Sequence, residues 1–307
     1  MIKERIDDAA RALAKQGERT RAALAGLTEA DAARTAWDDW TVKDLLGHVE
    51  ASHRGLLRRM NGTVAPAVPG QTLADVNEAR RQERTGWTLA HTLEQIEDGR
   101  RALLDYLASL TDADAERAIP LTGGRSLPLW RIAWLTFAHE REHVADVARV
   151  LGRPAVGQVA SLNISKGGVP KLPIYKAELG ELGLAGDRHR GRMHGGPTAA
   201  LCIYALETIQ RLQNEGHPIY PGAIGENVTV AGIDWAAVKP GDRLRIGPAL
   251  VEVTRYTTPC LNIAPAFKEG DFSRVHHANV PGEARVYTSV VEGGTITVGD
   301  EVEHLPA

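Results

Sequence analysis

The sequence predicts two domains, an all-α four-helix bundle followed by a mostly β barrel. Up to about residue 152, apolar residues recur every three or four positions, which is the period of an amphipathic helix. After residue 156, short β-branched runs alternate with Gly and Pro, which is typical of strands and turns. With 307 residues and 43% apolar content, the chain can bury a core in each half. We therefore expect domains at residues 1–153 and 156–307.

Four segments of the first half carry the helical period, as expected for a bundle. Thr28, Thr41 and Thr111 each precede an Asp by three residues, so each threonine can cap the first turn of a helix. Gly152 and Pro154 are expected to stop the last helix. The expected helices begin near Ile2, Val42, Leu89 and Leu129, and the later ones end near Met60, Leu107 and Leu151.

Short strands with "KPGD" and "EGG" turns fill the second half, which suggests a closed or nearly closed β-barrel that carries some helix. One helix is expected at about Thr198–Asn214. The expected strands are Val156–Ser165, Ile174–Leu179, Glu226–Val230, Asp242–Gly247, Ala249–Arg255 and Ala284–Gly293.

The net charge of −3 and the pI near 6.4 favour neither nucleic acid nor an anionic membrane as partner. The first residues, "MIKERIDDAARALAKQ", do not resemble a secretory signal, and the stretch "LPLWRIAWLTFAH" is interrupted by Arg131 and too short to span a bilayer. Two cysteines, Cys202 and Cys260, form no disulfide framework and suit a reducing compartment. A cytoplasmic location and a small-molecule partner are expected.

The motif "HEREHV" at residues 139–144 contains His-Glu-x-x-His. On a helix, His139 and His143 lie one turn apart on one face, so both imidazoles can reach one metal ion. A zinc protease needs a third ligand downstream, but Arg149 stands where the metzincin pattern has its histidine, and the helix ends near Gly152. The protease hypothesis is therefore disfavoured.

A third ligand must come from upstream, where the second helix offers His48 and His53. Helical periodicity puts His53 near the centre of the apolar face and His48 on its flank. The stretches "WTVKDLLGHVEA" and "HEREHV", however, resemble the DinB-like four-helix bundles, over about residues 1–152. That family includes mycothiol-dependent maleylpyruvate isomerase and bacterial thiol S-transferases. Its tryptophan and first histidine match Trp40 and His48, so the resemblance implies His48, His139 and His143 as metal ligands.

Three neutral imidazoles leave a position open on Zn²⁺ or Ni²⁺, as a catalytic site requires. Such a metal lowers the pKa of a bound thiol below its free value of about 8.5, and the resemblance implies this chemistry. Glu140 and Glu142 are expected to project away from the metal, towards solvent or as supporting residues. The alternative is that the histidines are polar members of the bundle interior, satisfied by ordinary hydrogen bonds.

Several motifs of the second half, "GLAGDRHRGRMHGGP", "GAIGENVTV", "VKPGDRLRIG" and "TRYTTPCLNI", resemble the MOSC domain from about Val156 to Glu303. That domain occurs at the C-terminus of molybdenum cofactor sulfurases, in amidoxime-reducing proteins and in small bacterial reductases. Its cysteine in a Pro-Cys context carries a persulfide or ligates molybdenum, which maps onto Cys260. The resemblance implies a role for Cys260 in sulfur or molybdenum chemistry.

The residues around Cys260 also suit a reactive thiol. Pro259 fixes the backbone just before it, and the cation of Arg255 favours the thiolate, so both Cys260 and Arg255 are candidate catalytic residues. Cys202 lies among apolar residues on the expected helix and is assigned to the core.

The segment 187–194 is basic and lies beside three glycines, a composition that suits binding of an anionic group such as phosphate or carboxylate. For Arg190 and Arg192, a solvated surface position is the alternative. In "GEN", Glu226 and Asn227 either bind a ligand or cap a turn. The candidate substrate- or cofactor-binding residues are Arg188, His189, His194, Glu226 and Asn227.

Together these features predict a metal-dependent enzyme of thiol and sulfur chemistry that cleaves carbon–sulfur bonds or transfers sulfur through a persulfide on Cys260. One alternative is an oxidoreductase that holds molybdenum cofactor with Cys260 as the metal ligand. Another is a binding module that sequesters a thiol cofactor without catalysis. Pyridoxal phosphate is not expected, because neither Lys166 nor Lys171 stands out as a Schiff-base former.

Overall fold

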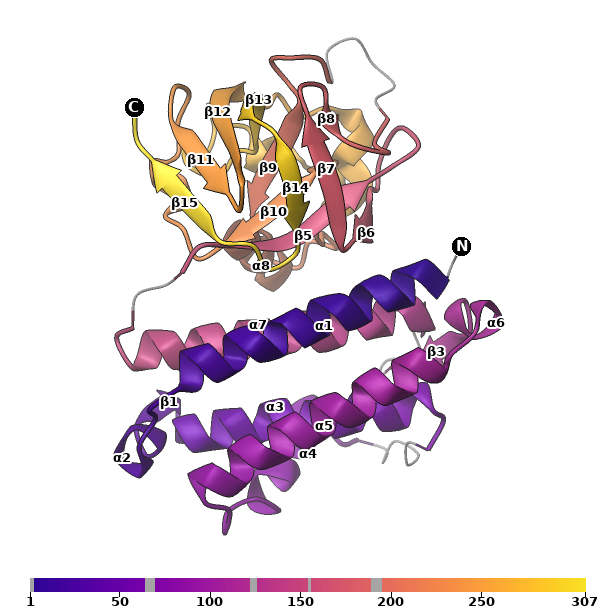
Figure 1. Cartoon of the computed structure of the whole chain (residues 1–307), viewed down its shortest axis with the longest axis vertical. Coiled ribbons are helices and arrows are strands. Elements are labelled where there is room, and N and C mark those ends of the chain that lie inside the picture. Colours follow the sequence, from indigo (N-terminus) through magenta and orange to yellow (C-terminus); the bar gives the residue numbers. More distant parts are fainter. Residues whose placement is uncertain (1–2, 64–69, 122–125, 154–155, 189–194) are drawn as a thin grey trace. The chain divides into compact units, whose positions relative to one another are not determined.

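The computed structural model describes residues 3–63, 70–121, 126–153, 156–188 and 195–307. The chain divides into two compact units, residues 1–155 and 156–307, coloured indigo to magenta and magenta to yellow in Figure 1. None of the helices in these described ranges is long and apolar enough to cross a membrane.

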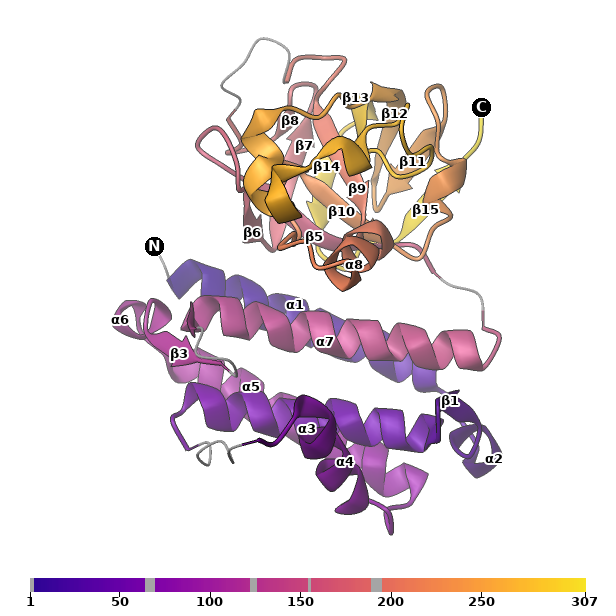
Figure 2. The same ribbon diagram turned by 180° about the vertical axis from the view of Figure 1, so that it is seen from behind.

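The first unit is built on four long helices, which confirms the predicted bundle. Helix α1 packs against α5 and α7, and α3 packs against the same two helices (Figure 2). Two short hairpins and three shorter helices complete the unit. The long helices are α1 (Lys3–Leu24), α3 (Val42–Met60), α5 (Leu89–Ser109) and α7 (Leu129–Val150); the shorter elements are α2 (Glu29–Ala32), β1 (Thr35–Trp37), β2 (Trp40–Thr41), α4 (Leu73–Gln82), α6 (Asp112–Ala115), β3 (Ala118–Pro120) and β4 (Ser126–Pro128).

Threonine caps start the helices as predicted. The hydroxyl of Thr41 accepts a hydrogen bond from the backbone N–H of Asp44 at 3.2 Å, and the Asp44 carboxylate accepts one from the backbone N–H of Thr41 at 2.9 Å. Thr28 makes the same reciprocal pair with Asp31, and it starts α2. Helix α4 was not predicted, because it has no buried residue and so no apolar period, although Thr72 caps it in the same way.

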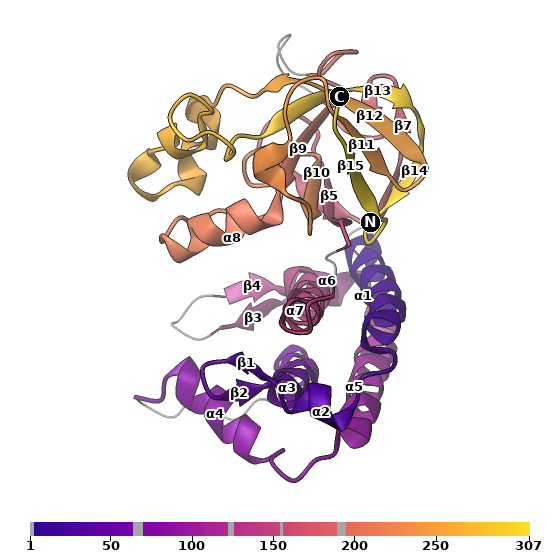
Figure 3. The same ribbon diagram turned by 90° about the vertical axis from the view of Figure 1, so that its left-hand side faces the viewer.

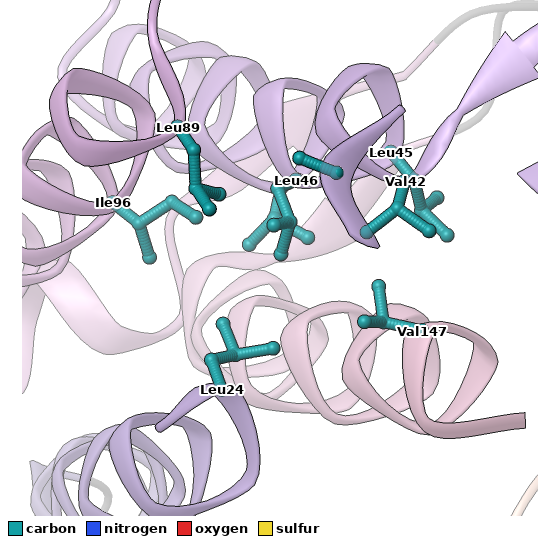
Figure 4. Close-up of a cluster of buried hydrophobic side chains, with 9 residues drawn as sticks. Leu24, Val42, Leu45, Leu46, Leu89, Ile96 and Val147 are labelled. Atoms are coloured by element: carbon teal, nitrogen blue, oxygen red, sulfur yellow. The ribbon is translucent and has the colours of Figure 1, made fainter. Parts of the chain in front are cut away.

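Apolar side chains of all four long helices meet in one cluster (Figure 4). Burial of such side chains provides most of the stability of a helix that is too short to persist alone. The labelled members are Leu24, Val42, Leu45, Leu46, Leu89, Ile96 and Val147. Gly152, at φ +65°, follows the end of α7 in the left-handed conformation, as expected of a helix C-terminus. The role predicted for Pro154 lies outside the described residues.

The second unit is mostly β. Its main sheet has eight strands in the order β15-β11-β12-β13-β9-β10-β5-β6, and a second sheet has the order β14-β7-β8. The strands are β5 (Gln158–Ile164), β6 (Leu172–Ile174), β7 (Lys176–Gly180), β8 (Gly183–Leu184), β9 (Leu201–Ala205), β10 (Val228–Ala231), β11 (Arg243–Ile246), β12 (Ala249–Tyr256), β13 (Val286–Glu292), β14 (Gly294–Thr297) and β15 (Val302–Leu305), with helix α8 (Leu206–Asn214) and the short helices η1 (Trp235–Ala237), η2 (Leu261–Ala266), η3 (Lys268–Gly270) and η4 (Ser273–Val275).

The main sheet is not a fully closed barrel within the described residues. Its ladder ends at β15 on one side and at β6 on the other. An isolated antiparallel bridge between Gln158 and Glu301 still joins the beginning of β5 to the residue just before β15. Of the two predicted architectures, closed or nearly closed, the structure thus has the nearly closed one.

The helix predicted at Thr198–Asn214 is wrong in its first half. Residues Leu201–Ala205 form β9, which pairs with β10 in parallel and with β13 antiparallel, and all five residues are buried. A short, continuously apolar run is ambiguous, because a fully buried strand and a buried helix show no distinguishing period. The helix begins only at Leu206.

Candidate metal centre

Three imidazoles of the bundle converge. His139 and His143 lie one turn apart on α7, and their Nε2 atoms are 3.2 Å apart. His48 comes from α3, and one nitrogen from each of the three rings lies within 4.8 Å of the other two. This is the set of residues that the DinB resemblance implied. The structure therefore brings together the three residues that could hold a metal ion.

The spacing of these nitrogens suits a metal. Two imidazole ligands at 2.0–2.1 Å from a tetrahedral ion are separated by roughly 3.3 Å, close to the 3.2 Å between His139 and His143. Nδ1 of His143 lies 3.2 Å from a carboxylate oxygen of Asp146. A proton on that Nδ1 leaves the Nε2 lone pair directed at the cluster, as carboxylates commonly orient metal-binding histidines.

Two buried ring nitrogens have no hydrogen-bond partner among the described residues, Nδ1 of His48 and Nδ1 of His139. Buried polar groups are normally paired, so the unpaired Nδ1 of His48 favours a site that binds a further group, whereas His139 directs its Nε2 towards His143. Burial, followed by the positive charge of His143, lowers the pKa of His48 to about 4 and that of His139 to about 2. Both rings are therefore neutral near pH 7, the form that binds metals.

Aromatic rings from the β1–β2 hairpin cover the cluster. The centroid of the Trp37 ring lies 4.9 Å from that of His143, and the Trp40 ring lies 5.7 Å from that of His48. The guanidinium of Arg81, on α4, lies 5.8 Å from the centre of the Trp40 ring. Figure 3 shows both hairpins and α4 on the same side of α3 and α7. The two tryptophan rings therefore pack against the imidazoles of His143 and His48.

Of the two alternatives expected for Glu140, the structure contradicts the one that projects towards solvent, because its side chain is completely buried. One carboxylate oxygen accepts hydrogen bonds from Thr20 and Arg100, each at 2.6 Å. The other accepts one from Arg100 at 3.0 Å and lies 3.1 Å from Nε2 of His53. Burial opposes ionisation, but His53 and Arg100 together lower the pKa of Glu140 to about 2. Glu142 is exposed, as predicted.

Two glycines give this buried network its space. A Cβ atom at Gly17 of α1 would lie 2.8 Å from the side chain of Arg100, and one at Gly99 of α5 would lie 3.1 Å from Cβ of His53. Because Glu140 of α7 contacts Thr20 of α1, His53 of α3 and Arg100 of α5, residues from all four long helices meet at Glu140. Periodicity correctly placed His53 at the centre of the buried face, but this ring contacts Glu140 and is outside the three-histidine cluster.

Cys260 lies in the second unit as an exposed, free thiol. It follows β12 and immediately precedes η2. Nη1 of Arg255 donates a hydrogen bond to the Thr198 carbonyl at 3.2 Å, and its guanidinium lies 4.8 Å from the centre of the Tyr287 ring. Burial first, then the charges of Cys202 and Cys260, raise the pKa of Tyr287 to about 12. The catalytic roles of Cys260 and Arg255 remain predictions.

Cys202 lies on β9, not on a helix, and burial raises the pKa of its thiol to about 11. The thiol therefore stays protonated and unreactive near neutral pH.

Glu226 and Asn227 are buried in the protein interior. One carboxylate oxygen of Glu226 accepts a hydrogen bond from the backbone N–H of Gly222 at 2.6 Å, and burial raises the pKa of this carboxyl group. Asn227 donates a hydrogen bond to the Asp187 carboxylate at 2.8 Å. Asp187 also pairs with buried Lys171. The only feature of the sequence that points to this contact is that Lys171 stands between apolar residues.

Arg188 is exposed, and its backbone N–H donates a hydrogen bond to the Ser165 carbonyl at 2.9 Å. The other members of the predicted basic segment, His189, Arg190, Arg192 and His194, lie outside the described residues. A binding role for Arg188, His189, His194, Glu226 and Asn227 remains a prediction.

The fold and the histidine cluster together define a class of protein. It has a helical bundle with a histidine site that could hold a metal, followed in the chain by a β domain with an exposed cysteine. The DinB superfamily matches residues 6–147, and the MOSC domain matches residues 190–303. The chain therefore carries a DinB-superfamily domain followed by a MOSC domain, which confirms both resemblances.

Among known proteins, the chain is similar to YflK of Bacillus subtilis, an uncharacterized protein, with 34% identity over 113 residues, which cover 36% of this chain and 50% of YflK. It is 29% identical to YiiM of Escherichia coli over 130 residues, 41% of this chain and 57% of YiiM. The chain thus spans about half the length of these curated relatives. The solved structure of YfiT from Bacillus subtilis, described as a probable metal-dependent hydrolase with an unusual four-helix bundle topology, aligns with a TM-score of 0.41 and 17% identity over 48% of this chain and 88% of that chain.

Proposed function

We propose that this protein is a metal-dependent enzyme of thiol and sulfur chemistry. The DinB and MOSC domains together support a function associated with metal and sulfur. The observation that carries the proposal is the convergence of His48, His139 and His143, which supplies three imidazole nitrogen donors from two helices. Zn²⁺ and Ni²⁺ are among the divalent ions that suit imidazole ligands.

In this proposal the three histidines hold the ion and leave a position open for a thiol. A bound ion lowers the pKa of that thiol, so that the sulfur is a nucleophile near neutral pH. Asp146 fixes the ring and the tautomer of His143. Trp37 and Trp40 exclude water beside the histidines, which strengthens electrostatic interactions there.

For the second unit we propose that Cys260 accepts sulfur. Its thiolate attacks the outer sulfur of a persulfide donor, so that a new sulfur–sulfur bond forms on Cys260 while the donor's sulfur–sulfur bond breaks and the donor leaves as a thiolate. This step needs no external oxidant or reductant. The exposure of Cys260 supports it, because a sulfur donor can reach an exposed thiol. Carbon–sulfur bond cleavage belongs to the same proposal: the Cys260 thiolate attacks the carbon of a substrate thioether, a new carbon–sulfur bond forms on Cys260, and the substrate sulfur leaves as a thiolate.

The second candidate is an oxidoreductase that binds molybdenum cofactor, with the exposed thiol of Cys260 as the molybdenum ligand. The match to the MOSC domain and the accessibility of this thiol favour it. A binding module without catalysis is the third reading, in which Cys260→Ala binds a thiol ligand as the wild type does and changes no reaction rate.

Elemental analysis of the purified chain tests the proposal. We expect about one equivalent of a divalent transition metal in the wild type, and its loss in His48→Ala and His139→Ala. His91→Ala, at an exposed histidine of α5, is the matched control and should keep the metal. Metal that survives His48→Ala and disappears in His53→Ala would show that the ligand set is wrong. Intact-mass measurement then separates the candidates for Cys260, since one extra sulfur atom supports sulfur transfer and stoichiometric molybdenum supports the oxidoreductase.

A further inference from the structure

Two arginines near the histidine cluster, Arg80 and Arg58, have no paired carboxylate among the described residues. Arg80 on α4 is half-buried, and its pKa is lowered by burial first and then by the positive charges of Arg58 and Arg84. Glu83 opposes this repulsion, and Arg59 adds to it with a smaller effect. Like charges held together destabilise a fold, so such a cluster needs a compensating interaction.

Two neighbouring arginines, Arg81 and Arg84, are paired with carboxylates that compensate their charge. Arg81 pairs with Glu78 at 2.8 Å, and Arg84 pairs with the buried carboxylate of Glu50 at 2.7 Å. In the described part of the chain, by contrast, no carboxylate or carbonyl accepts a hydrogen bond from the guanidinium of Arg80 or Arg58. Their donors are therefore available to an anion from solution.

A glycine makes the position of Arg80 possible. A Cβ atom at Gly55 of α3 would lie 3.2 Å from Nη2 and 3.6 Å from Cζ of Arg80, so the guanidinium rests directly on the helix. Gly55 follows His48 by seven residues, which places both on the same face of α3, roughly 10 Å apart along its axis. Helix α4 and the β1–β2 hairpin lie on one side of α3, as Figure 3 shows. Arg80 and the metal-binding face of α3 are therefore neighbours on that side.

We propose that Arg80, assisted by Arg58, binds the anionic end of a low-molecular-weight thiol whose sulfur reaches the His48, His139 and His143 cluster. The planar guanidinium offers two parallel donors to a carboxylate or a phosphate. The separation of roughly 10 Å along α3 selects a thiol whose anionic group lies several bonds from its sulfur. This inference rests on the proposed function and names the substrate class of the same site.

The test uses the full chain loaded with Co²⁺ and two thiols of equal length, 6-mercaptohexanoate and the neutral 6-mercaptohexan-1-ol. Thiolate binding is followed by the sulfur-to-cobalt absorption band. We expect the wild type to bind the acid roughly tenfold more tightly than the alcohol, the size of effect that a hydrogen bond to a charged group gives. Arg80→Gln should abolish this preference, and Arg58→Gln should reduce it.

Arg101→Gln is the matched control, because Arg101 is an exposed arginine of α5 that pairs with Asp98. It should keep the preference for the acid. The shorter 3-mercaptopropionate should gain little from Arg80, since its carboxylate cannot span the distance. Competition by glutarate and by inorganic phosphate, added separately, distinguishes a carboxylate site from a phosphate site.

The outcomes separate this inference from the proposed function. Equal binding of acid and alcohol to the wild type, or an unchanged preference in Arg80→Gln, overturns the anion site while the cobalt band still supports a thiol-binding metal centre. If neither thiol changes the cobalt spectrum, the proposed function fails. Calorimetry with glutarate alone then tests the anion site. Glutarate should bind the wild type and not Arg80→Gln. If glutarate does not bind the wild type, the anion site is overturned.

Discussion

Nε2 of His53 lies 3.1 Å from a carboxylate oxygen of Glu140, and both side chains are buried in the bundle. Glu140 is the glutamate of the His-Glu-x-x-His motif, which serves as general base in zinc proteases. Here its two oxygens are occupied by His53, Arg100 and Thr20. The motif thus supplies two histidines to the candidate metal centre, while its glutamate joins the four helices.

Replacing Glu140 tests this structural role. Glu140→Gln removes the buried carboxylate that pairs with Arg100 and leaves only Glu97, which is partly exposed, to compensate its charge, so we expect the free energy of unfolding to fall by about 3 kcal/mol. Glu142→Gln, at an exposed glutamate of the same helix, should change it by less than about 0.5 kcal/mol. Urea unfolding followed by helical circular dichroism gives both values. Similar stabilities for the two variants would contradict the network.

Asp146 should control metal affinity without controlling the fold. Asp146→Asn removes the carboxylate that orients His143, so we expect metal to bind about 10- to 100-fold more weakly, with the far-ultraviolet spectrum unchanged. Asp98→Asn, which removes a surface carboxylate paired with Arg101, is the control. Competition with a chromogenic chelator measures the affinities. Equal affinity in both variants would argue against His143 as a ligand.

Trp37 should report on occupancy of the site. Its ring lies 4.9 Å from that of His143, so a paramagnetic ion such as Co²⁺ bound there should quench its fluorescence. We expect Trp37→Phe to lose a large part of the quenching seen in the wild type, with the remainder due to Trp40. Trp235→Phe, in the second unit, should keep it in full. Unchanged quenching in Trp37→Phe would place the ion elsewhere.

The two thiols should differ sharply in reactivity. Cys260 is exposed, whereas Cys202 is buried with a pKa raised to about 11. Iodoacetamide at pH 8 should therefore label Cys260 and leave Cys202 unmodified until the protein unfolds. Peptide mass spectrometry identifies the labelled residue, and Cys260→Ser should remove the modification. Labelling of Cys202 in the native protein would contradict its position on β9.

Asp242 predicts a specific pH dependence of stability. Burial opposes its ionisation, but hydrogen bonds from His304 and from the backbone N–H groups of Ala307 and Lys239 hold its pKa below the usual 3.8. A lowered pKa in the folded state stabilises the fold above about pH 4, and this contribution disappears as the pH falls through the folded-state pKa. The wild type should exceed Asp242→Asn in stability at pH 7.

Lowering the pH from 7 to 3 should narrow that gap in urea-unfolding midpoints. A gap that stays constant over this range would show that the Asp242 carboxylate contributes no ionisation-linked stability.

Much of the fold could be predicted from the sequence. Helical periodicity located the four long helices. The Thr–Asp pairs marked the beginnings of α3 and of the short helices α2 and α6, because capping depends on residues only three positions apart. Helix α4 was missed because it buries no side chain, and β9 was mistaken for helix because its run is apolar throughout. Local patterns are informative only where one face of an element differs from the other.

The sequence by itself determined which residues could meet at the candidate metal centre: the spacing of His139 and His143 within one turn, and a histidine eight residues after Trp40 on an earlier helix. Only the tertiary structure brought His48, and not His53, beside His139 and His143, turned Glu140 into the bundle, and set Arg80 against Gly55. Periodicity reports that a residue is buried, but the partner of a buried polar group depends on the packing of helices that are far apart along the chain.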